Sequence, residues 1–398
     1  MRQSPAAAPS PSPQPKSKIQ NRSTLGWSVL TVWRMRVAKV PLGERTYSIL
    51  IGGGLLKRLG AYCRELALGK RCALITDRNV GPLYARAAQQ SLGKAGFEPL
   101  LITVPAGEKA KRLEVVARCY DQLAAHRLER RSFVLALGGG VVGDLAGFVA
   151  SSYLRGIPFV QVPTSLLAQV DSSVGGKVGV NLDAGKNLVG AFHQPRLVLC
   201  DLDTLKSLPM RELRAGLAEV IKYGVIYDAA LFARLETELP RLLDRHPGVL
   251  GEIVARCCEI KAEVVSQDEA ESGLRSILNF GHTIGHAIEN SVGYGRYLHG
   301  EAIAIGQVAA ALLSAVTVGL TSEAVLRIYR LLAGAGLPTR IRLNAAQQNR
   351  LLQAMALDKK VSAGEIKFVL AERIGKVCWG QKVSPRLVRD VLNITEAE

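Results

Sequence analysis

Aromatic residues are scarce in this chain, and the spacing of its cysteines indicates no disulfide framework. Only 5% of the 398 residues are Phe, Trp or Tyr, and no basic run is interleaved with them. A surface for single-stranded nucleic acid stacks bases on aromatic side chains, so the composition argues against one. The seven cysteines form no C-x-x-C motif and no paired spacing. We therefore expect reduced thiols in a reducing compartment, and a structural zinc site is not indicated.

Acidic residues are missing from residues 1–43, and composition sets residues 1–35 apart. This stretch is basic and rich in Pro, Ala and Ser, which predicts a disordered extension. The same composition resembles an organelle transit peptide. We expect a cytoplasmic protein, with a plastid location as the alternative if the extension is a transit peptide. The apolar stretch 25–33 is short and lacks a small-residue cleavage pattern, which argues against a secretory signal.

Long uncharged stretches are also rare, and the one at residues 302–320 is long enough to be a transmembrane candidate. It directly follows His299, a candidate ligand, and it includes Gln307. Because a ligand site needs a buried supporting helix, an enclosed core helix is the better interpretation. We therefore expect no membrane association.

The formal net charge of the chain is +17, which suits anionic partners. Nucleic acid and phosphorylated small molecules both meet that requirement. Because aromatic residues are few, we expect a positively charged cleft for a small phosphorylated substrate and no nucleic-acid binding.

The pattern of apolar segments divides the chain into two regions, as its length leads us to expect. In residues 36–204 short apolar runs alternate with helical segments, which predicts an α/β domain with a mostly parallel sheet. In residues 205–398 helical periodicity dominates, which predicts a mainly α-helical domain. Strands are predicted at 47–51, 72–76, 100–104, 133–137, 159–162, 197–200 and 367–370, and helices at 212–227, 249–267, 273–290, 302–318 and 324–335.

Three of the six histidines fall between positions 282 and 299. His282 and His286 are four apart and share a helix face, and His299 follows a loop that contains glycine. A helical His pair with a third ligand is a recurrent divalent-metal site. Arg275 and Asn279 extend the same polar stripe on the predicted helix, and burying that stripe without partners would be costly. This segment is therefore predicted to hold a metal or a polyanionic ligand.

Glu219 and Lys222 are three apart in the apolar segment GLAEVIKYG. On an exposed helix such a pair is a surface ion pair worth about 0.3–0.5 kcal/mol. In an apolar helix, a buried carboxylate that needs a cation is the better interpretation. Glu219 is thus a candidate third metal ligand beside two histidines, with positions left open as in catalytic zinc sites.

A glycine-rich turn follows the predicted strand at 133–137. Gly138, Gly140 and Gly143 satisfy G-x-G-x-x-G, a motif whose backbone N–H groups approach a pyrophosphate. Alone the match is weak, because no acid lies about twenty residues downstream. Polar residues also follow two other predicted strands, where turn chemistry or an exposed helix start is the other explanation: Asp77, Asn79, Glu108 and Lys111. Motifs at three consecutive strand ends point to one crevice.

Two segments place a lysine beside glycine, namely Lys177 in DSSVGGK and Lys186 in GKN. Loops of this kind can present an ammonium group and backbone donors to a phosphate. Each lysine alone is more often a surface charge. Together with Arg155 near the fifth predicted strand, they favour an anion site.

Six longer segments carry a family resemblance: GGGVVGDLAGF, QVPTSLLAQVDSSVGGK, GKNLVGAFHQP, GLAEVIKYG, GLRSILNFGHTIGHAIE and LHGEAIAIG. In this order, within the stretch from about residue 36 to 390, they resemble the 3-dehydroquinate synthase family. The resemblance implies an α/β NAD-binding domain followed by an α-helical domain that binds metal and substrate. It also implies a homodimer that uses NAD and a divalent metal, zinc or cobalt.

The resemblance also implies roles for individual residues. The metal ligands would be Glu219, His282 and His299, so His286 would face the substrate. The NAD-binding residues would be Asp77, Asn79, Glu108, Lys111, Gly138, Gly139, Gly140, Val141, Asp144, Thr164 and Ser165, although the family often has Thr at position 165. The catalytic residues would be Lys222, Lys261, Arg275, Asn279 and His286. Substrate would be held by Arg155, Asp171, Lys177, Lys186, Asn187 and Lys359.

Two of these implied roles carry a qualification. Arg155 would reach the phosphate site of the neighbouring subunit. The segment DKK leaves open whether Lys359 or Lys360 makes the contact.

The reaction implied is the conversion of 3-deoxy-D-arabino-heptulosonate 7-phosphate to 3-dehydroquinate and phosphate. It proceeds through transient NAD-dependent oxidation, β-elimination of phosphate, reduction and intramolecular aldol closure. The alternatives are another NAD- and metal-dependent sugar phosphate cyclase, or a polyol dehydrogenase of similar architecture.

Overall fold

The computed structural model describes residues 35–291, 296–357 and 366–394, all within one compact unit. Of the predicted extension, only Met35 lies within these ranges, and Lys359 and Lys360 lie outside them. The predicted domain boundary at 204/205 stays a prediction.

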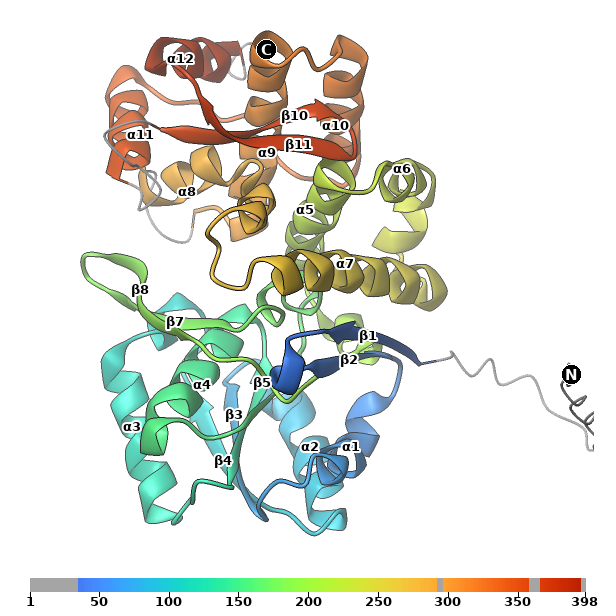
Figure 1. The fold of residues 1–398 in the computed structure, drawn as a ribbon, viewed down its shortest axis with the longest axis vertical. Helices are drawn as coiled ribbons and strands as arrows, with labels where there is room; N and C mark the ends of the chain where they lie inside the picture. The colour runs from blue at the N-terminus through green and yellow to red at the C-terminus, as the bar shows by residue number, and fades with distance from the viewer. Residues whose placement is uncertain (1–34, 292–295, 358–365, 395–398) are drawn as a thin grey trace, which may run out of the picture. The chain divides into compact units, whose positions relative to one another are not determined.

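A mostly parallel sheet is the centre of the first half of the chain (Figure 1). Within the described residues it has seven strands, in the order β1-β2-β9-β6-β5-β3-β4. Neighbouring strands are parallel except β1 and β2. The strands are β1 (Arg36–Val40), β2 (Tyr47–Gly52), β3 (Arg71–Asp77), β4 (Glu98–Val104), β5 (Phe133–Gly138), β6 (Phe159–Pro163) and β9 (Leu197–Asp201). The six strands predicted here are confirmed. The sequence pattern misses β1, which alternates weakly because most of its residues are exposed.

Helices cover both faces of this sheet (Figure 1). They are α1 (Leu59–Glu65), α2 (Gly81–Lys94), α3 (Leu113–Ala125) and α4 (Gly140–Ser152). Successive side chains of a strand point to opposite faces. Leu74 therefore joins the core under α1 and α2, whereas Ile75 joins the core under α3 and α4. This arrangement confirms the α/β fold class.

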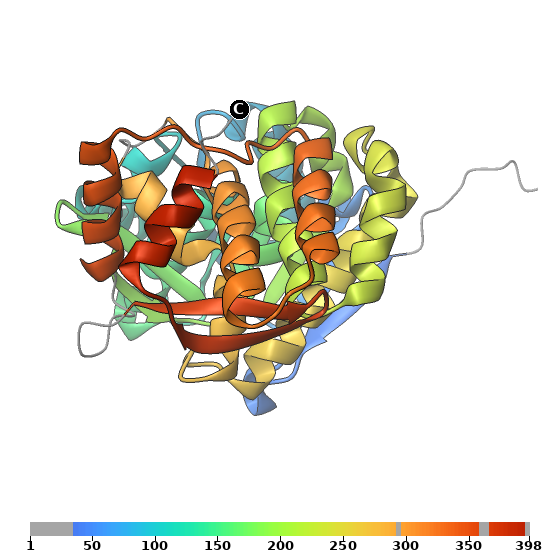
Figure 2. The same cartoon turned by 90° about the horizontal axis from the view of Figure 1, so that it is seen from above.

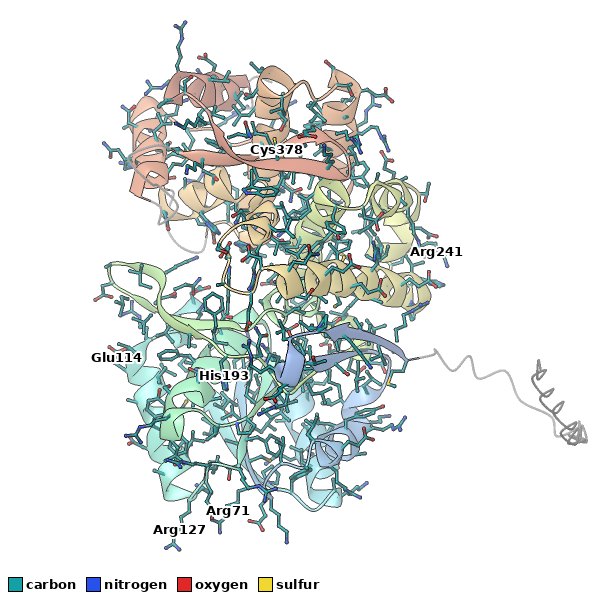
Figure 3. All side chains as sticks on the ribbon, in the orientation of Figure 1. Arg71, Glu114, Arg127, His193, Arg241 and Cys378 are labelled. Atoms are coloured by element: carbon teal, nitrogen blue, oxygen red, sulfur yellow. The ribbon has the colours of Figure 1, made fainter. Side chains whose placement is uncertain are left out.

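The carboxyl ends of the parallel strands face the helical half of the chain. Arg71, at the amino end of β3, lies at the end of the sheet that points away from those helices (Figure 3). β3 lies between β4 and β5, so the direction in which strands are added reverses there. Such a reversal opens a crevice beyond the carboxyl ends. Asp77 and Gly138 end β3 and β5 at this point.

A hairpin outside the sheet carries two predicted anion-binding segments. Its strands, β7 (Lys177–Leu182) and β8 (Gly185–Phe192), pair antiparallel. The expectation that Lys177 and Lys186 lie in loops is therefore wrong, because both are at strand starts. Glycines and polar residues dilute the apolar alternation in both strands, so the sequence pattern does not reveal them.

The second half of the chain is mainly helical (Figures 1 and 2). Its helices are α5 (Met210–Ile226), α6 (Ala229–Leu243), α7 (Pro247–Gln267), α8 (His282–Ser291), α9 (His299–Thr317), α10 (Ser322–Gly334), α11 (Ala345–Leu357) and α12 (Pro385–Ile394). An antiparallel hairpin, β10 (Lys367–Arg373) with β11 (Lys376–Lys382), adds to them. The predictions for α5, α7, α9, α10 and β10 are confirmed. No prediction matches α6, α11, α12 or β11.

The continuous helix predicted at 273–290 is wrong. A 3-10 segment, Leu274–Asn279, ends before Gly281, and α8 begins at His282. Gly281 has a φ of 78°, which a helix does not allow. It also lies where a Cβ atom would be 2.7 Å from the backbone nitrogen of Gln307. Arg275 and Asn279 therefore do not share one regular helix with the histidines.

α9 is the described helix that is long and apolar enough to cross a membrane, and 72% of its apolar window is buried inside the protein. It contacts α5, α8 and α10, and Figure 2 shows it among the helices. Ile303, Ile305 and Leu313 are fully buried. This burial confirms the expected core helix.

Candidate metal and nucleotide site

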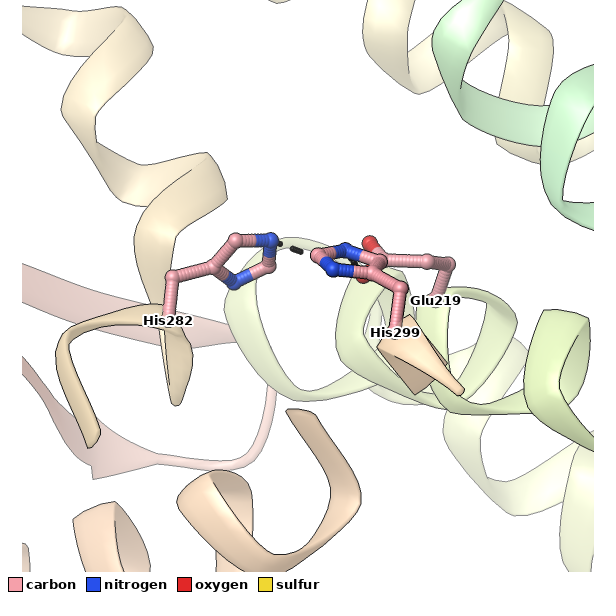
Figure 4. A group of neighbouring side chains, drawn as sticks. All are labelled: Glu219, His282 and His299. Atoms are coloured by element: carbon pink, nitrogen blue, oxygen red, sulfur yellow. Dashed lines mark ion pairs between the residues drawn. The ribbon is translucent and has the colours of Figure 1, made fainter. Parts of the chain in front are cut away.

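A buried carboxylate on α5 faces two imidazoles (Figure 4). Glu219 is fully buried, and its Oε1 lies 3.5 Å from Nε2 of His282 and 3.5 Å from Nε2 of His299. Its Oε2 forms an ion pair with Lys222, one turn along the helix. Within the described residues, neither carboxylate oxygen has a hydrogen-bond partner of good geometry. Buried oxygens short of donors suit a bound cation.

The three side chains fit a divalent metal ion. Their ligand atoms lie within 4.8 Å of one another. Ligands about 2.0–2.1 Å from one tetrahedral zinc ion are themselves about 3.3–3.4 Å apart. The two measured separations of 3.5 Å are close to that value. Two imidazoles and a carboxylate are also donors that zinc and cobalt accept.

Charges around these ligands keep the carboxylate ionised. Burial raises the pKa of Glu219, but Lys222 and His299 outweigh burial and lower it below its usual value. Burial lowers the pKa of His299, whereas Glu219 and Glu289 together raise it to about 10. A divalent cation would displace this proton, because metal ligands bind in their deprotonated form.

A glycine brings two of the ligands together. A Cβ atom on Gly300 would lie 2.5 Å from the carbonyl carbon of Ala215, and closer still to its oxygen. Only glycine therefore allows the start of α9 to approach α5 this closely. Ala215 lies about one turn before Glu219, and Gly300 follows His299. The backbone contact thus sets the distance between the two ligands.

His286 lies beside this group without belonging to it. Its ring centroid is 5.3 Å from that of His282 and 5.9 Å from that of His299. A ring nitrogen of His286 instead lies within 4.8 Å of ligand atoms of Glu289 and His299. Its expected contact with substrate stays a prediction.

Asp171, predicted to hold substrate, and Lys261, predicted to be catalytic, form an ionic cluster next to Lys222, which pairs with Glu219 of the metal group. Lys261 donates to the carboxylate of Asp171 at 2.7 Å and to its carbonyl oxygen at 2.6 Å. Tyr223, which no sequence pattern indicates, donates to the same carboxylate at 3.1 Å. Burial raises the pKa of Asp171, but Lys261 and Lys222 outweigh it, so the pKa is lowered.

Arg275 is 2% exposed, and backbone carbonyls hold its guanidinium. Its Nη1 donates to Glu269 at 2.6 Å and its Nη2 to Gly175 at 3.1 Å. Its buried Nε has no hydrogen-bond partner within the described residues. Gly175 has a φ of 96°, and a Cβ atom there would lie 3.2 Å from Cζ of Arg275. This glycine is therefore required for the guanidinium to lie against the loop.

Glu271 joins a residue predicted to hold substrate to a residue predicted to be catalytic. It forms an ion pair with Lys177 and accepts a hydrogen bond from Asn279 at 3.0 Å. Glu271 has a φ of 60°, which is unusual for a residue with a side chain. No spacing in the sequence indicates this carboxylate, because its loop has no periodicity.

Glu289 makes a similar bridge on α8. One oxygen lies 3.1 Å from Nζ of Lys186 and the other 3.3 Å from Nδ1 of His299. A sequence signal for it does exist. Glu289 follows His282 by seven residues and His286 by three, so it shares their helix face.

The glycine-rich turn packs closely at the carboxyl edge of the sheet. A Cβ atom would lie 2.6 Å from Val142 if placed on Gly138, and 2.9 Å from Ser172 if placed on Gly140. The corresponding atom on Gly139 would lie 3.5 Å from Oγ of Ser165. The glycines therefore allow the tight turn between β5 and α4 to form, and the N–H groups at such a helix start suit a pyrophosphate. Two more residues of the predicted NAD set lie here, Val141 in the first turn of α4 and Thr164, whose N–H donates to Gly138 at 2.9 Å.

Lys111 connects a residue predicted to bind NAD with a residue predicted to hold substrate. It donates to Asp144 at 2.6 Å and to Asn187 at 2.5 Å. Burial raises the pKa of Asp144, and Lys111 only partly opposes that effect. Asn187, which we expected to hold substrate, thus lies against residues expected to hold the nucleotide.

Three other predicted residues have different surroundings. The carboxylate of Asp77 accepts the N–H groups of Asn79 and Val80 at 2.8 and 2.9 Å, which is the turn chemistry named as the alternative. Glu108 accepts a hydrogen bond from Asn181 at 2.8 Å. Arg155 is exposed after α4, in neither metal-ligand group.

Fold and site together define an α/β protein with a dinucleotide-type turn at the carboxyl edge of its sheet and a candidate divalent-metal site on its helices α5, α8 and α9. The models of the N-terminal and C-terminal parts of 3-dehydroquinate synthase match residues 101–215 and 216–361. The 3-dehydroquinate synthase of Desulforamulus reducens is 51% identical over 343 residues, which is 86% of this chain and 95% of that protein. This chain belongs to the 3-dehydroquinate synthase family.

Two solved structures share the whole fold. A 2-deoxy-scyllo-inosose synthase, complexed with carbaglucose-6-phosphate, NAD⁺ and Co²⁺, is 27% identical with a TM-score of 0.82, covering 90% of this chain and 100% of that one. The 2-epi-5-epi-valiolone synthase of Streptomyces hygroscopicus, with NAD⁺ and Zn²⁺, is 29% identical with a TM-score of 0.82, covering 92% and 99%.

Proposed function

We propose that this chain is a lyase that converts 3-deoxy-D-arabino-heptulosonate 7-phosphate to 3-dehydroquinate and phosphate. The reaction combines transient oxidation, β-elimination of phosphate, reduction and intramolecular aldol closure. One observation carries the proposal. The family models match the stretch 101–361. This stretch contains the Glu219, His282 and His299 group together with the ionic cluster of Asp171, Lys222 and Lys261.

The cofactors proposed are NAD and one divalent metal ion, zinc or cobalt. Both solved relatives hold NAD⁺ and such an ion. Glu219, His282 and His299 would hold the metal, which supplies a Lewis acid that polarises a substrate alcohol. NAD would lie at the glycine-rich turn, and it supplies a hydride acceptor that is regenerated in each turnover.

The other polar groups bind the substrate and move protons. The buried Nε–H of Arg275 has no acceptor among the described residues. With Lys261, Arg275 would bind the substrate carboxylate, for which a planar guanidinium is well shaped. Lys177 and Lys186 would bind the phosphate, and His286 would transfer protons. The remaining members of the proposed site are Asp171, Asn187, Lys222, Asn279 and Lys359.

We also propose a cytoplasmic homodimer in which Arg155 completes the phosphate site of the neighbouring subunit. Exposed apolar side chains next to Arg155 and on β8 support an interface there, because exposed apolar patches can mark protein–protein contacts. Among the exposed apolar side chains, Leu154 precedes Arg155, and Leu188 and Phe192 lie on β8. The seven free cysteines suit a reducing compartment. Sedimentation equilibrium tests the dimer, and a monomeric mass would overturn it.

An anaerobic assay with NAD⁺, Zn²⁺ and the heptulosonate phosphate tests the reaction. We expect stoichiometric phosphate release with no net formation of NADH. Glu219→Ala should release phosphate at least about 10²-fold more slowly, because a Lewis acid contributes several kcal/mol to the transition state. The matched control is Glu236→Ala, which removes an exposed carboxylate on α6 that pairs with Arg327 and belongs to neither metal-ligand group. It should leave the rate unchanged.

The two alternatives predict different results in the same assay. Accumulation of NADH would identify a polyol dehydrogenase. Turnover of a sugar phosphate that lacks the carboxylate, without turnover of the heptulosonate, would identify another cyclase. Wild-type rates after complete removal of metal would overturn the role of the Glu/His/His group.

A further inference from the structure

Glu289 lies between the metal group and the β7–β8 hairpin. Its side chain is 10% exposed, so its charge requires partners. One carboxylate oxygen lies 3.3 Å from Nδ1 of His299, and the other lies 3.1 Å from Nζ of Lys186. Lys186 is 103 residues away in the chain and His299 is ten residues away. The carboxylate therefore joins a metal-ligand residue to a residue on β8.

The two histidines of the metal group are held in the same way. Each presents Nε2 to Oε1 of Glu219 at 3.5 Å. Each also directs Nδ1 at an acceptor, which is the carbonyl of Phe280 at 3.2 Å for His282 and the carboxylate of Glu289 for His299. An acceptor at Nδ1 retains the hydrogen there and leaves the Nε2 lone pair for a metal ion. The acceptor for His282 is backbone, whereas the acceptor for His299 is a side chain that can be replaced.

We propose that Glu289 is a positioning residue for the metal site. It holds His299 with Nδ1 protonated and Nε2 directed at the metal, and through Lys186 it couples that orientation to the hairpin. The proposal rests on the proposed metal-dependent function. Its consequence is that replacing Glu289 weakens metal binding although Glu289 does not touch the ion.

A direct-ligand role is the competing account. The ligand atoms of His286, Glu289 and His299 also lie within 4.8 Å of one another. A second ion held there would make Glu289 a ligand. Metal stoichiometry separates the two accounts, because positioning requires one ion per chain and direct ligation at the second group requires two.

The experiment measures metal affinity in Glu289→Ala, Glu289→Gln and Lys186→Met, by competition with a chromogenic chelator. We expect one ion per chain in each. Loss of an acceptor behind a ligating histidine typically weakens binding by about 10–100-fold, which we expect for Glu289→Ala. Glu289→Gln should show a smaller loss, because its amide oxygen can still accept from Nδ1–H. Lys186→Met should change metal affinity least, since it leaves the carboxylate beside His299.

A second readout does not depend on activity. The visible spectrum of the Co²⁺-loaded protein reports the ligands and their orientation, so Glu289→Ala should shift its bands. Glu236→Ala, the matched control, should keep both the spectrum and the affinity of the wild type. NAD affinity should be unchanged in every variant, which shows that the fold is intact. If Glu289→Ala does not fold, Glu289→Gln carries the test by the same measurements.

The possible failures are distinguishable. A wild-type protein that binds no divalent metal would overturn the proposed function and this inference with it. A wild type that binds metal, together with Glu289 variants of equal affinity and equal cobalt spectrum, would overturn only the positioning role. Two ions per wild-type chain would also overturn it, in favour of direct ligation.

Discussion

Replacing Gly300 by Ala should separate the two helices that carry Glu219 and His299. The new Cβ atom would lie 2.5 Å from the carbonyl carbon of Ala215, inside the 3.0 Å that real Cβ atoms keep. Its neighbour is backbone, which cannot rotate away. The start of α9 or the middle of α5 must therefore move by at least 0.5 Å.

Two effects follow from that displacement. Overpacking in a dense core typically costs about 1–3 kcal/mol, and the free energy of unfolding should fall by that amount. Ligands must also stay within about 0.5 Å of their productive positions. With Oε1 of Glu219 now 3.5 Å from Nε2 of His299, the displacement should lower metal affinity by about tenfold or more.

Urea unfolding of the metal-free protein and chelator competition measure the two effects separately. Gly93→Ala is the matched control. Gly93 lies within α2, and a Cβ atom there would have nothing within 4 Å. The free energy of unfolding of that variant should rise by about 0.5–1 kcal/mol, because alanine is a better helix former than glycine. Its metal affinity should not change. Wild-type stability and metal affinity in Gly300→Ala would refute the idea that this contact sets the ligand distance.

Two further predictions concern the loop before Arg275. Arg275→Lys should lower the free energy of unfolding by about 1.5–3 kcal/mol, because one ammonium cannot replace both guanidinium bonds to carbonyls. Urea unfolding checks this, and an unchanged midpoint would contradict it. Burial raises the pKa of Asp268, but hydrogen bonds from the backbone of Ser272, Arg275 and Gly273 lower it to about 2. The stabilisation is therefore complete above about pH 4, the unfolded value, and is lost as the pH falls toward 2. Thermal unfolding from pH 5 to pH 2 should show this loss in the wild type and less of it in Asp268→Asn. Parallel curves for the two proteins would count against the assignment.

Sequence patterns locate most of the regular structure where burial is uniform. Five of the six predicted sheet strands are buried along nearly their whole length because helices cover both of their faces. The sixth, the edge strand β4, is partly exposed. The patterns fail for the β7–β8 hairpin and β1, whose residues are glycine-rich, polar or exposed. They also fail at Gly281, because the helical spacing of Arg275, Asn279 and His282 continues across a residue whose φ of 78° ends any helix.

In the candidate site, too, some residues could be predicted from the sequence and others could not. Glu219, His282 and His299 could be selected from residue type, spacing and the family resemblance. Glu271 could not, because it is marked only by its contacts with Lys177 and Asn279.

The sequence by itself determined six strands of the central sheet, the helices α5, α7, α9 and α10, the family to which the chain belongs and the side chains that carry metal-binding chemistry. Local periodicity and residue type contain that information. The tertiary structure decided which of these side chains meet. Glu219 and His299 are brought together by the contact of Gly300 with Ala215, and Lys186 and His299 are joined by Glu289. These partners are far apart in the chain, so only the packing of one helix or hairpin against another brings them within bonding distance.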